Sequence, residues 1–296
     1  AGWAAEGVDL NPNDTQLITQ ALIFLGLGFI FWMAVFPFHT WIPQLAQEVF
    51  PYQAGFLLNV LAIVITLMGL DFLNGFGWLR NFNGLAEILR IGGALTVAAG
   101  GIWAAFERRL DRYMGFCLIA ETGFALLAMS LQNTTGYRAL VSAFLPRTLF
   151  IALWSLSLSS LKHSGLDLDQ TAGLARKKPV ESLALLMSTF AMAGLPLLGF
   201  FPIRQSLLEN LAQVSLPTVI WSLAGVAGLM AGSLRILFNI ITVHDQPDPK
   251  PVPVSSDWRE IGLIGLGMLL LLLTGLFPQW FSTPLFNLLN AFQNLM

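Results

Sequence analysis

The strongest constraint on this fold is a series of eight apolar stretches, each about twenty residues long or slightly longer. They cover residues 15–36, 52–73, 82–106, 112–131, 138–161, 182–201, 215–241 and 258–281. A helix of that length rises about 30 Å, which is the thickness of the hydrocarbon core of a bilayer. A β-barrel would show shorter segments of alternating polarity. The sequence therefore predicts an all-α integral membrane protein with about eight transmembrane helices.

The composition supports one membrane domain over residues 1–296. Charged residues make up 11% of the chain and hydrophobic residues 55%, whereas soluble domains hold roughly 25% charged residues. We divide the domain into helices around a first broken helix (15–73), a five-helix unit (82–241), and a terminal helix with its tail (258–296). With a net charge of −2 and no large basic patch, nucleic acid is not an expected partner.

The loops predict the orientation in the membrane, because Lys and Arg collect on the cytoplasmic side. Basic residues gather after the third, fifth and seventh stretches, namely Arg108, Arg109, Lys162, Arg176, Lys177, Lys178 and Lys250. Loops 107–111, 162–178 and 244–257 should be cytoplasmic, with both termini on the opposite side of a bacterial inner membrane, thylakoid or equivalent energy-coupling membrane. Residues 1–6 lack the basic region of a signal peptide, so we expect a processed or truncated end.

The chain has no motif of a soluble enzyme: it lacks a P-loop, HExxH, CxxC and a dinucleotide-binding glycine loop. Its three histidines, at 39, 163 and 244, are far apart, and Cys117 is alone within an apolar stretch. We therefore expect no cofactor and no metal on this chain, and no internal disulfide.

Two of the stretches contain helix-breaking residues where the bilayer should be. The breaks span residues 36–43 and 194–202, and the elements concerned are Pro37, Pro43, Gly194, Pro196, Gly199 and Pro202. His39 lies within the first break. Interrupted helices at membrane depth are tolerated where they are buried in protein or line a wet cavity. Either break alone could be a simple kink, but two together favour an ion or substrate path.

Ionisable residues inside apolar stretches are the other candidates, since a charge near the bilayer centre costs several kcal/mol unless it is paired or hydrated. Asp71, Arg204 and Arg235 lie near predicted helix ends, which favours interfacial anchoring. Glu87 and Arg90 share a helix face and could form a structural ion pair or a relay element.

Glu121 and Arg147 are the deepest predicted charges. Burial and a nearby cation change the proton affinity of a carboxylate in opposite directions, which suits a proton relay. The alternative is a static ion pair between them that only fixes helix packing. The relay candidates are therefore Glu121, Arg147, Glu87, Arg90, Arg204 and His39.

Four segments resemble the antiporter-like subunits of respiratory complex I, which are similar to Mrp antiporter and membrane-bound hydrogenase subunits. Residues 36–43 (PFHTWIP after Phe36) resemble the family's PFHTWLP signature, and residues 193–200 resemble its AGxPxxxGF broken helix. Residues 111–124 and 275–278 resemble a core helix start and the end of the last core helix. The resemblance implies about fourteen helices in two inverted repeats, of which this chain would hold the second repeat and flanking helices, without the N-terminal helices.

Departures from the family pattern fall at its proton-carrying positions. Two family lysines fall on Trp32 and near Ile63, and in the second repeat a lysine or histidine falls close to Arg147. The lysine after the second break falls at Ile203 or Arg204, and Glu121 replaces a common histidine. Arginine is a poor proton carrier because its guanidinium group stays charged in proteins. Any channel implied by the resemblance is therefore altered.

The resemblance leads to three functional hypotheses. The first is a divergent antiporter-like membrane subunit of a complex I type NAD(P)H or ferredoxin:quinone oxidoreductase, contributing to proton or cation translocation. The second is a non-conducting structural subunit of that assembly. The third is a subunit of an Mrp-type cation antiporter or a membrane-bound hydrogenase. Expected partners are lipid and other membrane subunits, including a chain that could supply the missing N-terminal helices.

Overall fold

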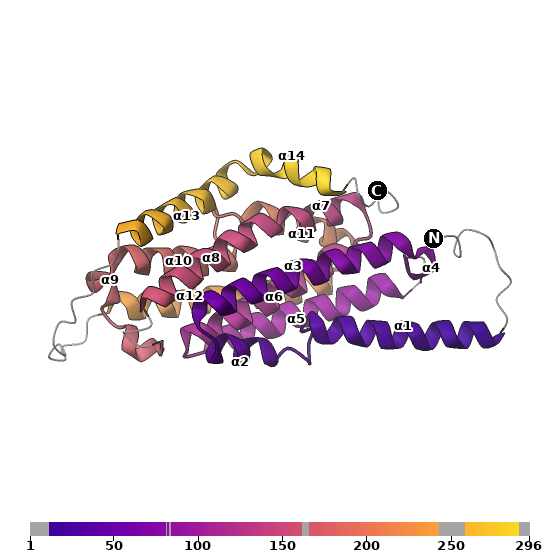
Figure 1. The fold of residues 1–296 in the computed structure, drawn as a ribbon. Coiled ribbons are helices and arrows are strands. Elements are labelled where there is room, and N and C mark those ends of the chain that lie inside the picture. The colour runs from indigo at the N-terminus through magenta and orange to yellow at the C-terminus, as the bar shows by residue number, and fades with distance from the viewer. Residues whose placement is uncertain (1–11, 81, 83, 162–165, 243–257, 290–296) are drawn as a thin grey trace.

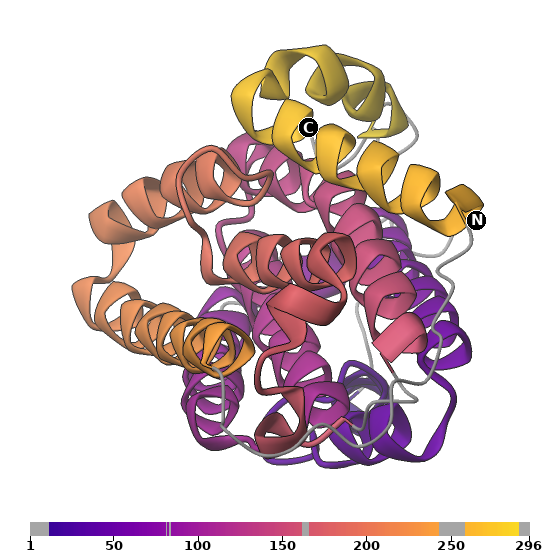
Figure 2. The same cartoon turned by 90° about the vertical axis from the view of Figure 1, so that its left-hand side faces the viewer.

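The computed structural model describes residues 12–80, 82, 84–161, 166–242 and 258–289, and its elements are helices (Figure 1). The longer helices are α1 (Pro12–Trp32), α3 (Pro51–Gly75), α5 (Leu85–Phe106), α6 (Leu110–Ser130), α8 (Phe144–Leu161), α10 (Pro179–Ala193), α11 (Phe201–Val214), α12 (Leu216–Ile241), α13 (Trp258–Leu276) and α14 (Pro278–Leu289). The shorter ones are α2 (Trp41–Glu48), α4 (Gly77–Arg80), α7 (Thr134–Ser142), α9 (Leu174–Lys177) and a 3₁₀ turn, η2 (Leu168–Thr171). Viewed from one end, they form a bundle with α13 and α14 along one edge (Figure 2).

Six described helical spans are long and apolar enough to cross a membrane. They are α3, α5, α6, the α7–α8 pair, α12 and α13. The other two predicted stretches correspond to α1, whose described apolar part is Ile23–Trp32, and to α10. The expected all-α membrane fold with two discontinuous helices is confirmed, and the chain is a multi-pass membrane protein. The sequence did not predict the division between α7 and α8 at Ala143.

Both predicted breaks interrupt helices, but their bounds differ from the prediction: they cover residues 33–40 and 194–200, and Pro43 and Pro202 lie in the first turns of α2 and α11, where proline is tolerated. The two helices before the breaks end in the same way. Gly194 follows α10 with a positive φ of 78°, and the amide of Leu195 donates to the carbonyl of Phe190. This is the hydrogen bond of a Schellman motif, which favours glycine at the left-handed position. Ala34 takes that position after α1, with a φ of 52°, and the amide of Val35 donates to the carbonyl of Ile30.

Helix α6 runs through the centre of the molecule and is almost wholly buried. Its neighbours α5 and α12 approach closely because small residues line the contacts. Gly100 of α5 lies against the backbone of Ala120, and Gly101 lies against the backbone of Gly225 in α12. Without a hydrophobic driving force between helices in lipid, such close backbone contact is a main source of stability. It also fixes the position of Glu121 on α6.

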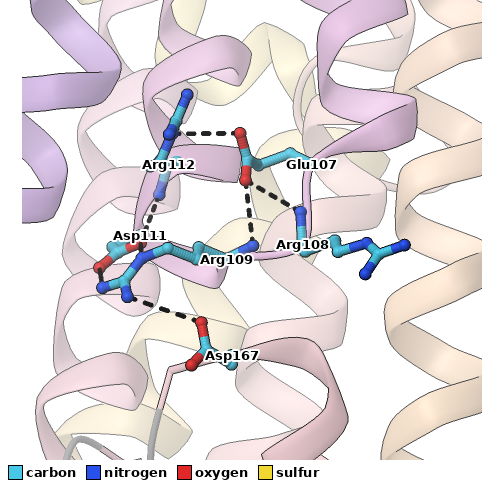
Figure 3. Close-up of polar contacts among 6 residues, drawn as sticks. All are labelled: Glu107, Arg108, Arg109, Asp111, Arg112 and Asp167. Atoms are coloured by element: carbon cyan, nitrogen blue, oxygen red, sulfur yellow. Dashed lines mark hydrogen bonds and ion pairs between the residues drawn. The ribbon is translucent and has the colours of Figure 1, made fainter.

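A cluster of charges holds the α5–α6 turn to the segment before η2 (Figure 3). Arg109 pairs with the buried carboxylate of Asp111 at 2.7 Å and with Asp167 at 3.5 Å, while Arg112 pairs with Glu107 at 3.2 Å. The hydrogen bonds that Arg109 donates to the carboxylate of Asp111 raise the pKa of Arg109, so this guanidinium stays charged. The cluster thereby anchors the start of α6.

Candidate functional site

The centre of the site is the carboxylate of Glu121, near the midpoint of α6. Its residue is 4% exposed, and its Oε2 accepts a hydrogen bond of 3.0 Å from Nη2 of Arg204, which is 5% exposed. Charge-assisted hydrogen bonds of this kind are stronger than neutral ones. Residues 83 positions apart thus form a buried ion pair.

The broken helix explains why Arg204 lies there. In an unbroken helix the carbonyl of Met192 would accept from residue 196, but Pro196 has no N–H. Nη1 of Arg204 donates to that carbonyl instead. The guanidinium also lies over the rings of Phe124 and Phe200, 4.4 and 5.0 Å from their centroids, at distances that favour cation–π attraction. The last turn of α10, the first turn of α11 and α6 are therefore joined through one side chain.

Arg147 is a second buried guanidinium, 6% exposed, on α8 directly after Pro146. Among the described residues its side chain has no ion pair and no hydrogen bond, and its Nε is buried without a partner. Arg147 lies about halfway along the 28-residue span formed by α7 and α8. Depth and burial therefore agree with the prediction that Arg147 is one of the deepest charges.

A central cavity at these residues adjoins two others. This central cavity of about 30 Å³ is lined by Glu121, Arg147, Arg204 and Thr66, among others. A larger pocket of about 280 Å³, between α7, α11 and α14, shares Ala139 and Ile203 with it. A third cavity of about 20 Å³ shares Ala62 and Arg147 with the central one and reaches Trp32 and Trp41 beside the first break. A volume of 30 Å³ is enough for a water molecule.

The static ion pair considered between Glu121 and Arg147 is not observed. The carboxylate of Glu121 pairs with Arg204 instead. Arg204 is also not an interfacial anchor, since the break turns the start of α11 into the protein. The ion pair predicted between Glu87 and Arg90 does not form among the described residues: Glu87 is exposed and Arg90 half-buried.

The remaining candidates lie away from this site. His39 is 5% exposed, stacks on Phe36 with ring centroids 5.6 Å apart, and has an Nδ1 without a partner. Asp71 is exposed. Arg235 is half-buried and donates to the carbonyl of Ala105. The relay role of His39 and the interfacial anchoring of Asp71 and Arg235 stay predictions.

Of the break residues, Gly199 packs most tightly. A Cβ at Gly199 would lie 2.5 Å from Oγ1 of Thr274 and 3.0 Å from Cβ of Pro146. The second break is therefore held between α8 and α13.

Sequence reasoning missed the cavity-lining residue Thr66 and the carbonyl of Met192, although the position of Pro196 could have identified the latter. In the described part of the chain, no group of three or more His, Cys, Asp or Glu side chains could hold a metal.

Comparison with known proteins gives consistent matches. The family model described as "NADH:quinone oxidoreductase/Mrp antiporter, TM" matches residues 8–231. NADH-quinone oxidoreductase subunit N of Parafrankia sp. (strain EAN1pec) is 26% identical over 287 residues, which cover 94% of this chain and 53% of the relative. The chain thus spans about half the length of the curated relatives it matches.

Two solved structures share the fold. A chain of the membrane-bound sulfane sulfur reductase, an archaeal respiratory membrane complex, superposes with a TM-score of 0.84 at 19% identity, covering 98% of this chain and 58% of that one. A chain of the Mrp complex from Dietzia sp. DQ12-45-1b gives a TM-score of 0.79 at 15% identity, covering 94% and 61%.

Proposed function

Because the chain belongs to the NADH:quinone oxidoreductase/Mrp antiporter transmembrane family, we propose that it is an antiporter-like membrane subunit of a complex I type assembly. Its work is to contribute to proton or cation translocation by the whole complex. Redox cofactors belong to neighbouring subunits, and the partners of this chain are other membrane subunits. The names of the curated relatives support this assembly over an Mrp-type antiporter.

One observation carries the proposal: a carboxylate lies at the centre of a buried helix, beside a cavity that adjoins a larger pocket. Glu121 is paired with Arg204 at 3.0 Å and lines the central cavity together with Arg147. A water molecule in that cavity would bring protons to the carboxylate from the pocket between α7, α11 and α14. Neither arginine releases its proton, so Glu121 is the proton-carrying group and the arginines set its electrostatic environment.

Replacement of Glu121 by Gln tests this role. Gln keeps the shape and hydrogen-bonding capacity of the side chain but cannot exchange a proton. In membrane vesicles that contain the assembled complex, we expect Glu121→Gln to lower proton translocation per assembled complex severalfold, measured with a pH-sensitive dye. Glu209→Gln is the control, because Glu209 is an exposed carboxylate on α11.

The non-conducting structural subunit is the second candidate, favoured by Trp32 at a position where the family carries a lysine and by the two arginines. On that alternative the Glu121–Arg204 pair serves only packing, and Glu121→Gln reduces assembly first. Normal assembly together with normal translocation in Glu121→Gln would remove the residue from the mechanism and favour the structural subunit.

The proposed orientation places the α5–α6 turn and α9 on the cytoplasmic side and both termini opposite. Arg108 and Gln132 are exposed and lie at opposite ends of α6. We expect a membrane-impermeant thiol reagent, added from outside, to label Gln132→Cys and not Arg108→Cys. The native Cys117 is fully buried and supplies the unlabelled background. The reverse pattern would overturn this orientation. Lys162 and Lys250, used to predict it, lie outside the described residues.

A further inference from the structure

The central cavity contains more positive than negative charge. Its ionisable lining residues are Arg147, Arg204 and Glu121, so two guanidinium groups face one carboxylate. That carboxylate is bonded to Arg204. Arg147 has no hydrogen bond or ion pair from its side chain within the described part of the chain, although it is 6% exposed.

A buried, unpaired cation has three ways to lower its energy: release of a proton, exposure to water or a counter-ion. A lysine at this place could become neutral, but an arginine cannot, because its guanidinium group stays charged in proteins. A cavity of about 30 Å³ gives Arg147 only one or two water molecules. Glu121 lines the same cavity and its charge acts on Arg147, but its carboxylate is hydrogen-bonded to Arg204 and one negative charge cannot neutralise two guanidinium groups. A second counter-ion is the remaining solution.

The walls of the cavity suit an anion. Besides the two guanidinium groups, the first turn of α11 reaches the cavity through Ile203 and Arg204. The N-terminus of a helix carries partial positive charge, which attracts anions. The amides of Phe201 and Arg204 already donate within the chain and Pro202 has none, so the charge of this turn, and not its amides, favours an anion. The other lining residues are mostly small or apolar, such as Ala62 and Ala143, and a volume of about 30 Å³ favours a monatomic ion over a larger anion.

We propose that the cavity between Arg147 and Arg204 binds one small monovalent inorganic anion, of which chloride is the test ion. The anion neutralises Arg147 and leaves the Glu121–Arg204 pair intact. It also sets the potential that Glu121 experiences, so this inference rests on the proposed function of the same site. Anion binding is measured by thermal unfolding and bromide density, whereas the proposed function is measured by proton translocation, so one proposal can be rejected while the other stands.

The first test is the thermal unfolding of the purified full-length protein in detergent, in sodium chloride and in sodium gluconate at equal ionic strength and pH. Gluconate is too large for the cavity. We expect the unfolding midpoint to rise with chloride concentration and to saturate, as for any ligand that binds only the folded state. Equal midpoints in the two salts at all concentrations would overturn the proposal.

Variants locate the effect. Arg147→Met removes the cation while keeping an unbranched apolar stem, so the chloride dependence should disappear. Arg108→Met removes an exposed arginine outside the cavity and should keep the dependence. Chloride dependence that is unchanged in Arg147→Met would also overturn the proposal.

A direct measurement covers the case in which Arg147→Met does not fold. Wild-type protein crystallised in sodium bromide should give an anomalous peak beside Arg147, and maps without a peak there would contradict the proposal. A carboxylate from a neighbouring subunit at that place would also contradict it. A bromide peak together with normal translocation in Glu121→Gln would keep the anion site and reject the proposed function, whereas impaired translocation without a peak would do the opposite.

Discussion

Replacement of Arg204 by Met should be among the most damaging single changes in the chain. It leaves the carboxylate of Glu121 buried without its hydrogen-bonded partner and the carbonyl of Met192 without a donor. Breaking a buried ion pair by removing one member costs roughly 3–5 kcal/mol. We expect a loss of that size in the free energy of unfolding, seen as a lower thermal midpoint and a smaller yield of folded protein in detergent.

A double variant separates the ion pair from simple packing. Glu121→Gln combined with Arg204→Met removes both charges, so it should be more stable than Arg204→Met alone even though it carries one more substitution. Arg138→Met is the control, because Arg138 is an exposed arginine whose described contact is with the ring of Phe286. A loss below about 1 kcal/mol in Arg204→Met would mean that the pair behaves like an exposed salt bridge.

Replacement of Gly101 by Leu should prevent stable folding. A Cβ at Gly101 would overlap the backbone of Gly225, and one at Gly225 would overlap the carbonyl of Val97. A rigid backbone cannot move aside as a flexible side chain can. Overpacking costs about 1–3 kcal/mol where neighbours adjust, and we expect Gly101→Leu to reach or exceed the upper end. The measurement is the yield and thermal midpoint of the purified protein.

Gly265 offers a matched control for this substitution. It is a glycine in the long apolar helix α13, and a Cβ there would meet no atom within 4 Å. Gly265→Leu adds the same side chain and improves helix propensity, so its stability should equal or exceed that of the wild type. Equal stability of Gly101→Leu and Gly265→Leu would show that the α5–α12 crossing relaxes easily.

Features that depend on neighbouring residues in the sequence could be predicted, whereas contacts between residues far apart in the sequence could not. Apolar length and the positions of proline and glycine are local signals, so the helices and both breaks were predictable. Ala34 adopts a left-handed conformation at a position where glycine is usual, so the sequence did not reveal this turn. The division at Ala143 gave no composition signal either.

The partner of Glu121 was beyond the reach of such signals. Arg204 lies 83 positions away, and only the path of the chain through the second break brings it to α6. Its place near a predicted helix end favoured an interfacial role, since sequence position gives depth along one helix and not burial among several. Pro196 was the overlooked clue: a proline that deprives a buried carbonyl of its donor requires a replacement donor nearby.

The hydrogen bonds of Arg204 link the position of α11 at the second break to the charge of Glu121. One guanidinium connects the end of α10, the start of α11 and the carboxylate on α6. Sliding α11 relative to α10 must therefore change the electric potential at Glu121, and a proton added to Glu121 must weaken the attraction that holds α11 in place. Movement of α11 and protonation of Glu121 are therefore linked. A neighbouring subunit that displaced α11 would change the proton affinity of Glu121 without contacting it.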